Sequence, residues 1–172
     1  MDIKLKKTLK KISETAIKQG EFIFTDEQTK LKWLGNEPAS ADEIKQLEER
    51  LQITLPKDYK DFLSITNGFT TPNENIEPTF ESTVNVGFLK DIDPEIIEIW
   101  INNDELLDVA IKLARSIIVG GRNQEQYFLL VPPLSESGEW EYWKFASWIP
   151  GEDPYEGIEN YFINALDFLK GA

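Results

Sequence analysis

The sequence contains no histidine and no cysteine. Without histidine there is no imidazole base near neutral pH, no Ser-His-Asp machinery and no histidine ligand for a metal ion. Without cysteine there are no disulfide bonds, thiolate nucleophiles or zinc–thiolate sites. The catalytic chemistry that remains is acid/base work by carboxylates, a lysine or tyrosine route, or a carboxylate-bound hard cation such as Mg²⁺ or Ca²⁺.

Long apolar runs are absent as well. No stretch approaches the roughly 18 apolar residues of a membrane span, and the N-terminal segment MDIKLKKTLKKISETAIKQG lacks the apolar centre of a secretory signal. We therefore expect a soluble, cytoplasmic protein. Because 172 residues with 41% hydrophobic side chains suffice for one globular core, we expect a single domain over residues 21–172, preceded by a helical extension over residues 1–20.

Positive charge is concentrated in the first 20 residues. This segment holds six lysines against Asp2 and Glu14, a local charge of +4, whereas the whole chain carries −13. The rest of the chain therefore carries −17. So acidic a body repels phosphate backbones and anionic membranes, which are bound chiefly through lysine and arginine. The charge predicts no nucleic-acid or membrane partner and favours a basic protein.

Helical signals dominate the first half of the chain. An apolar stripe over residues 5–16 predicts an amphipathic helix that packs on the body, and residues 21–24 predict a short strand. Ser40 and Glu43 have the spacing of a capping box, so a helix is predicted to begin there. A second helix is predicted from Pro56 to a left-handed stop at Asn67-Gly68.

Strand signals follow in the second half. Alternation over residues 83–88 predicts a half-buried strand, with Val84, Val86 and Phe88 on its apolar side. Two apolar runs around a Gly-Gly-Arg-Asn turn predict a hairpin over residues 116–133, and residues 139–148 predict a third strand. Helices are predicted over residues 94–114, with a break at Asn102-Asn103, and over residues 158–171. This order favours an α+β fold: an antiparallel β-sheet with helices packed mainly on one face.

Residues 33–68 carry a specific combination of motifs. A Trp-x-Gly element is followed by a helix that bears a glutamate, then by Leu-Pro-x-x-Tyr-x-x-Phe-Leu and Asn-Gly. These positions are Trp33, Gly35, Glu48, Leu55, Pro56, Tyr59, Phe62, Leu63, Asn67 and Gly68. The pattern resembles the signature of the SUKH superfamily, specifically its Smi/Knr-type branch. Beyond Phe69 only the order of strands and the final helix agree with that family.

The resemblance implies an α+β fold and a non-enzymatic role. Many bacterial members serve as immunity proteins that neutralise a toxin, often a nuclease or deaminase, and others, including fungal cell-wall assembly regulators, are interaction modules. The motif residues are interpreted as structural, because aromatic residues at helical spacing are usually core residues. The working surface is therefore expected elsewhere.

Two groups of acidic residues are the predicted partner-binding surface. The first contains no lysine or arginine and consists of Asp91, Asp93, Glu95, Glu98, Asp104, Glu105 and Asp108. The second surrounds Tyr155 at the expected start of the last helix and consists of Glu152, Asp153, Glu156 and Glu159. Asp153 and Glu156 equally suit the positive end of that helix, which leaves a structural role open. Tyr155, Trp140 and Trp148 are candidate anchors of the interface.

Three hypotheses follow. The first is an immunity protein that binds a basic toxin domain, with no catalytic residue, metal or cofactor. The second is a regulatory interaction module without a toxin partner. The third is a carboxylate-dependent hydrolase that uses Glu139 and Glu141, or Asp91 and Asp93, although neither spacing is diagnostic. The identity of the toxin, the mode of inhibition, the oligomeric state and the role of the basic N-terminal helix stay open.

Overall fold

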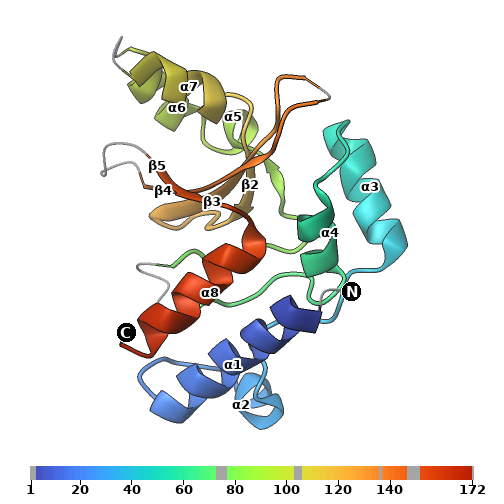
Figure 1. Cartoon of the computed structure of the whole chain (residues 1–172), viewed down its shortest axis with the longest axis vertical. Helices are drawn as coiled ribbons and strands as arrows, with labels where there is room; N and C mark the ends of the chain where they lie inside the picture. Colours follow the sequence, from blue (N-terminus) through green and yellow to red (C-terminus); the bar gives the residue numbers. More distant parts are fainter. Residues whose placement is uncertain (1–2, 73–76, 103–105, 136, 147–151, 172) are drawn as a thin grey trace.

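The computed structural model describes residues 3–72, 77–102, 106–135, 137–146 and 152–171 (Figure 1). Four helices precede the first strand: α1 (Ile3–Gln19), α2 (Asp26–Leu31), α3 (Ala41–Leu51) and α4 (Lys57–Leu63). Next along the chain are β1 (Gly87–Phe88), α5 (Leu89–Ile92), α6 (Pro94–Ile101) and α7 (Leu107–Leu113). The remaining elements are β2 (Ile117–Gly120), β3 (Gln126–Val131), β4 (Glu141–Ala146), β5 (Glu152–Tyr155) and α8 (Ile158–Leu169).

The strands form one antiparallel sheet in the order β1-β2-β3-β4-β5. The longest pairing joins β3 and β4, where Leu129 is opposite Trp143. The predicted α+β fold with an antiparallel sheet is therefore confirmed, as is the hairpin around the Gly-Gly-Arg-Asn turn. Helix α6 ends just before Asn102, in agreement with the predicted break, whereas Asn103 lies outside the described residues. Among the described residues, no helix combines the length and apolar character that crossing a bilayer requires.

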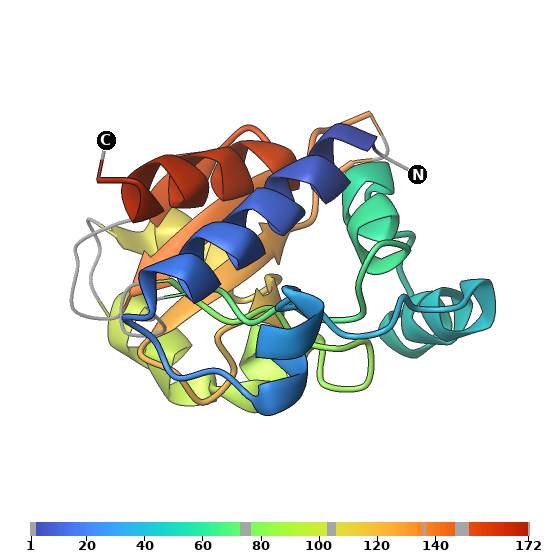
Figure 2. The same ribbon diagram turned by 90° about the horizontal axis from the view of Figure 1, so that it is seen from below.

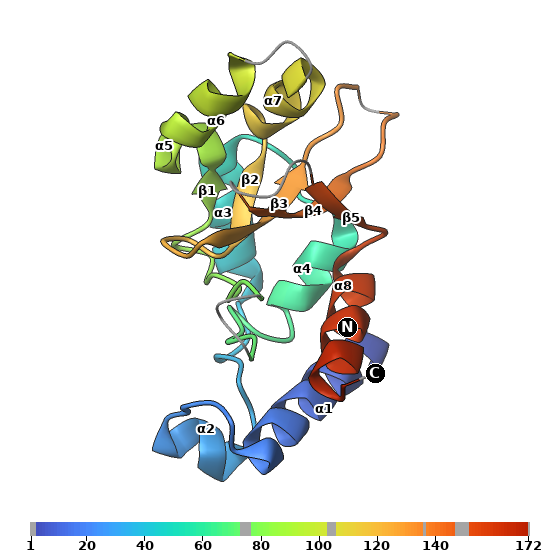
Figure 3. The same cartoon turned by 90° about the vertical axis from the view of Figure 1, so that its left-hand side faces the viewer.

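Residues of β2, β3 and β4 supply two separate hydrophobic cores, one on each face of the sheet. Val119, Phe128 and Leu130 belong to the larger core, together with buried residues of α1, α3, α4 and α8. Leu129 and Trp143 face the smaller core beneath α5, α6 and α7. Figures 1 and 3 show α5–α7 on one side of the sheet and α1, α4 and α8 on the other. Helices thus also cover part of the second face, because β2 and β3 are apolar on both sides.

Helix α1 lies alongside α8 and shares the larger core (Figure 2). Its apolar stripe is fully buried at Leu9 and Ile12. Ser13 Oγ donates to Leu9 O at 2.9 Å and accepts from Leu34 N at 3.2 Å. Gln19 Nε2 donates to Leu169 O at 2.8 Å, which ties the ends of the two helices together.

Two of the predicted strands are wrong. Residues 21–24 are irregular and Ile23 is fully exposed. Over residues 83–88 only Gly87–Phe88 is a strand, and the expected alternation fails at its start: Thr83 is buried and Val84 is exposed, whereas Val86 is buried as predicted. The cause is a turn held by Arg50, whose guanidinium donates to Thr83 O at 2.6 Å and to Val86 O at 2.7 Å.

The segment before the last helix contains a strand that the sequence analysis does not predict. Residues 152–155 form the edge strand β5, and α8 begins at Ile158, as predicted. Pro154 is tolerated in β5 because an edge strand leaves one row of its backbone groups unpaired. Asp153 is a strand residue opposite Lys144.

Candidate functional site

The Leu-Pro-x-x-Tyr motif builds helix α4 and one wall of the larger core. Leu55, Tyr59, Phe62 and Leu63 are buried, and the rings of Tyr59 and Phe62 stack with centroids 6.0 Å apart. Pro56 is the N-cap residue, with φ −64. A proline costs little there, because the first N–H groups of a helix have no intrahelical partner.

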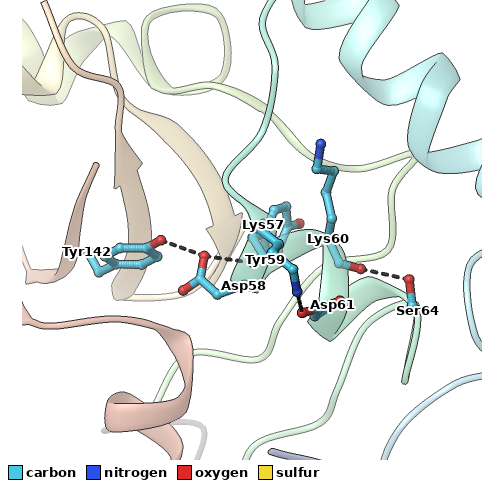
Figure 4. Close-up of polar contacts among 7 residues, drawn as sticks. All are labelled: Lys57, Asp58, Tyr59, Lys60, Asp61, Ser64 and Tyr142. Carbon is cyan, nitrogen blue, oxygen red and sulfur yellow. Dashed lines mark hydrogen bonds and ion pairs between the residues drawn. The ribbon is translucent and has the colours of Figure 1, made fainter. Parts of the chain in front are cut away.

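Asp58 connects α4 to two other elements, and the sequence reasoning missed it. Its carboxylate accepts from Tyr142 Oη at 2.6 Å and from Tyr59 N at 2.8 Å (Figure 4). It also accepts from Ile158 N at 3.3 Å. Burial, followed by the hydrogen bond to Asp58, raises the pKa of Tyr142 above its ordinary value, so that its phenol remains a donor. One carboxylate thereby joins α4, β4 and the start of α8.

Glu48 and Asn67 fix the two ends of this motif. Glu48 Oε1 accepts from Leu55 N at 2.8 Å and from Lys60 Nζ at 3.0 Å, which holds the turn between α3 and α4. Asn67 Oδ1 accepts from Thr83 N at 2.7 Å, which attaches the turn over residues 83–86. Gly68 has φ +100, and a Cβ there would lie 3.1 Å from Phe80 O.

Trp33 and Gly35 lie beside the same, larger core. The half-buried Trp33 ring meets Phe69 edge to face, with centroids 5.7 Å apart. A Cβ at Gly35 would lie 2.2 Å from Thr66 Oγ1 and 2.8 Å from the Trp33 ring. Gly35 also bridges to Phe69, so only a residue without a side chain fits between these groups.

The acidic residues of α5–α7 form an exposed surface on the opposite face of the sheet. Asp91, Glu95, Glu98 and Asp108 are exposed, and Asp93 is half-buried between α5 and α6. We call these five residues the α5–α7 acids. Within the described residues none of them forms an ion pair. The predicted Asp104 and Glu105 lie outside the described residues.

An open groove of about 590 Å³ runs between α6 and the start of β3. We call it the α6–β3 groove, and it is lined by Asp93, Glu95, Ile96, Ile99, Gln124, Glu125 and Tyr127. Tyr127 Oη donates to the Asp93 carboxylate at 2.6 Å. Burial, followed by that hydrogen bond and the charge of Asp93, raises the pKa of Tyr127 above its ordinary value, so the phenol stays protonated.

Of the residues that line the groove, sequence reasoning singled out only Asp93 and Glu95, and it missed Ile99 and Glu125. Ile99 is 66% exposed, although it lies in a helix that packs on the core. Glu125 is exposed in the turn before β3, where the sequence predicts only a hairpin. The buried residues of α6 are Ile96 and Trp100, and Ile99 lies to one side of the helix face that they share. That helical position is the sequence feature that could have identified Ile99 as exposed.

A family model for the SMI1 / KNR4 family (SUKH-1) matches residues 38–169. The chain belongs to the SMI1/KNR4 family (SUKH-1). The matched range includes α3 and α4 with their motif, the whole sheet and α8. Trp33, Gly35 and helix α1 precede it. No match was found among curated proteins.

The second predicted acidic group is partly engaged within this SUKH-1 chain. Glu159 forms an ion pair with Lys4 at 3.1 Å, so the basic N-terminal helix neutralises part of the group. Asp153 and Glu156 are exposed, and Asp153 accepts from Tyr155 Oη at 3.0 Å. The side chain of Glu152 lies outside what the structure describes.

Two of the three aromatic residues predicted as interface anchors, Tyr155 and Trp140, are partly buried against the larger core. Tyr155 packs against Tyr161 edge to face, with centroids 5.3 Å apart, and against Phe128. Trp140 is half-buried on the same core. Trp148 lies outside the described residues. Burial of Tyr155 and Trp140 against the core agrees with the general tendency of large aromatic side chains to be mostly buried.

In each carboxylate pair of the hydrolase hypothesis, one member is engaged with a neighbouring side chain. Glu141 forms an ion pair with Lys112 at 2.8 Å, and Lys112 also lies over the Trp143 ring. Glu139 is exposed and precedes β4. Across the part of the chain that the structure describes, no three acidic side chains are placed so that they could share a metal ion.

Proposed function

We propose that this SUKH-1 chain is an immunity protein that binds and neutralises a cognate basic toxin in the cytoplasm. The observation that carries the proposal is the set of α5–α7 acids, which are largely exposed and have no ion-pair partner within the described residues. Membership of a family with many bacterial immunity proteins supports the same role.

The electrostatic argument concerns how the two proteins meet. A toxin that cleaves or modifies nucleic acid needs a basic surface to hold phosphates. An exposed acidic surface raises the rate of encounter with such a protein and repels other acidic proteins. Charge of this kind sets the association rate and the choice of partner more than the final affinity.

The proposed inhibition requires no bond to be made or broken. The protein would cover the toxin's basic surface and so prevent access of its substrate. Two carboxylates that suit a hydrolase, Asp93 and Glu141, instead accept from Tyr127 and Lys112. Their engagement favours binding over acid/base catalysis, because a catalytic carboxylate must reach its substrate.

Co-expression tests this function directly. A toxin domain encoded beside this chain is expressed in a sensitive host with the wild-type protein, with an empty vector or with an unrelated protein of equal net charge. We expect survival only with the wild-type protein. Equal killing in all three cultures would contradict the proposal and favour a regulatory module.

A further inference from the structure

The α6–β3 groove combines an apolar floor with an acidic rim. Ile96 is buried beneath it, and Ile99 and the Tyr127 ring form its apolar wall. Asp93, Glu95 and Glu125 supply three carboxylates from two different segments of the chain, and no lysine or arginine lines the groove among the described residues. A groove of this composition suits a cationic ligand that also carries an apolar group.

The negative surface extends well beyond the groove. Asp91, Glu98 and Asp108 are exposed on α5, α6 and α7 outside the lining residues. A small cation held in the groove would leave these carboxylates uncovered. A protein surface with several lysines or arginines around one apolar side chain complements both the groove and its surroundings.

A second copy of this chain fits the groove less well. A twofold contact would place the same surface patch of both copies face to face, so that Glu95 and Glu125 of one copy would meet the same carboxylates of the other. Like charges across such an interface oppose association. The basic side chain of the neighbouring turn, Arg122, donates to Asn85 O and does not line the groove.

We propose that the α6–β3 groove is the docking site for a basic partner protein. One aliphatic or aromatic side chain of the partner packs against Ile99 and Tyr127, and flanking lysine or arginine side chains pair with Asp93, Glu95 and Glu125. This inference rests on the proposed function, since the toxin would be that partner, and it names the contact surface that the proposed function leaves open.

A peptide titration of the isotope-labelled full chain tests the groove without the toxin. The probe is a short synthetic peptide with one tryptophan between two pairs of arginines, and the matched probe has glycine in place of tryptophan. At physiological salt we expect the NMR chemical shifts of the backbone amides over residues 93–99 and 124–127 to change and to reach saturation as peptide is added. The glycine probe should bind more weakly by about threefold or more, because it buries no apolar surface.

Charge variants distinguish direct contacts between the peptide and the groove carboxylates from the effect of the protein's net charge. The double variant Glu95→Lys/Glu125→Lys should weaken binding of the tryptophan probe about tenfold or more. The double variant Glu37→Lys/Glu139→Lys changes the net charge equally at exposed positions away from the groove, and should change affinity less than about twofold. The exposed change Ile99→Ser should weaken binding about threefold or more while leaving the fold intact.

Several results would overturn the inference. Shifts centred on residues 153–159, or an equal loss of affinity in both double variants, would place the contact elsewhere or make it non-specific. Displacement of the probe by spermine with the same shifts would make the groove a small-polycation site. Concentration-dependent shifts of the protein alone, with a dimer in gel filtration, would make it a self-association surface.

The co-expression assay separates this inference from the proposed function. If wild-type protein protects the host and Glu95→Lys/Glu125→Lys protects it equally, the groove is not the docking site although the immunity function stands. If the wild-type protein fails to protect, the immunity function fails and the peptide titration still decides whether the groove binds basic protein segments. Protection by wild type and by Glu37→Lys/Glu139→Lys, but not by the groove variant, supports both.

Discussion

At the scale of single residues, Asp58 shows how the family motif holds the fold together. The motif reads Leu-Pro-x-x-Tyr, and Asp58 occupies its second variable position. Yet its carboxylate accepts from Tyr142 on β4 and from the backbone N–H of Ile158 at the start of α8. The hydrogen bonds of this one side chain therefore connect the motif helix to the sheet and to the last helix.

Replacement of Asp58 should destabilise the protein markedly. Asp58→Ala removes three hydrogen bonds to a charged group and leaves the Tyr142 hydroxyl without its acceptor, so we expect a loss of about 2–3 kcal/mol in the free energy of unfolding. Asp58→Asn keeps an acceptor oxygen and should lose less. Urea unfolding followed by circular dichroism measures the change.

Asp61 on the same helix is the matched control. Its ion pair within the described residues is with the exposed side chain of Lys57, so Asp61→Ala should change the free energy of unfolding by less than about 0.5 kcal/mol. Equal losses for Asp58→Ala and Asp61→Ala would show that the contacts to Tyr142 and Ile158 contribute nothing beyond helix charge.

At the scale of elements, helix α1 is an integral part of the packing. It precedes the residues matched by the family model, yet Leu5, Leu9, Ile12 and Ala16 belong to the larger core. The stripe has helical spacing and faces α8, while the lysines project outward. Lys4 is the exception that also reaches Glu159 at the start of α8.

Shortening a buried residue of α1 tests this role. Leu9→Ala removes a side chain with no exposed surface, and we expect a loss of about 2–5 kcal/mol in the free energy of unfolding. Lys11→Ala on the exposed side of α1 should stay within about 0.5 kcal/mol. If Leu9→Ala were as mild as Lys11→Ala in thermal and urea unfolding, α1 would be a dispensable appendage.

The sequence correctly predicted helices and strands whose determining residues lie within the element itself. Ser40 and Glu43 form the expected capping box, and the apolar runs of β2 and β3 form the expected hairpin. The first part of the strand expected over residues 83–88 is instead a turn, because Arg50 and Asn67 from distant segments bind its backbone; only Gly87–Phe88 is a strand. No pattern within residues 83–88 contains that information.

The candidate site was predictable only in part for the same reason. The charge of residues 91–108 is a local property and could be read directly. The groove depends on Glu125 and Tyr127, which lie near Asp93 only after β3 has paired within the sheet. The anchors were predicted among the aromatics, but Tyr155 and Trp140 are partly buried against the larger core, and the exposed apolar residue that lines the groove is Ile99.

At the scale of the whole molecule, every tyrosine is held in its neutral form. Burial is the first cause in all cases and raises each pKa above the ordinary value of 10.0. A neighbouring carboxylate adds to it, such as Glu77 at Tyr161 and Asp153 at Tyr155. The tyrosines concerned are Tyr59, Tyr127, Tyr142, Tyr155 and Tyr161.

Alkaline titration should therefore couple tyrosine ionisation to unfolding. Because the folded pKa values are raised, the stability they contribute is fully present below about pH 10 and is lost as the pH rises above it. We expect tyrosinate absorbance to appear together with loss of the circular dichroism signal, whereas the urea-unfolded chain titrates near pH 10. Tyrosine ionisation near pH 10 with an unchanged fold would contradict this expectation.

The charge distribution of the whole molecule is the basis of the proposed function. The most direct test is the association rate of the purified protein with the toxin domain, measured by stopped flow from low to high ionic strength. We predict that the association rate falls steeply as salt rises, while the dissociation rate changes little. An association rate that is independent of ionic strength would contradict the claim that an acidic surface captures a basic partner.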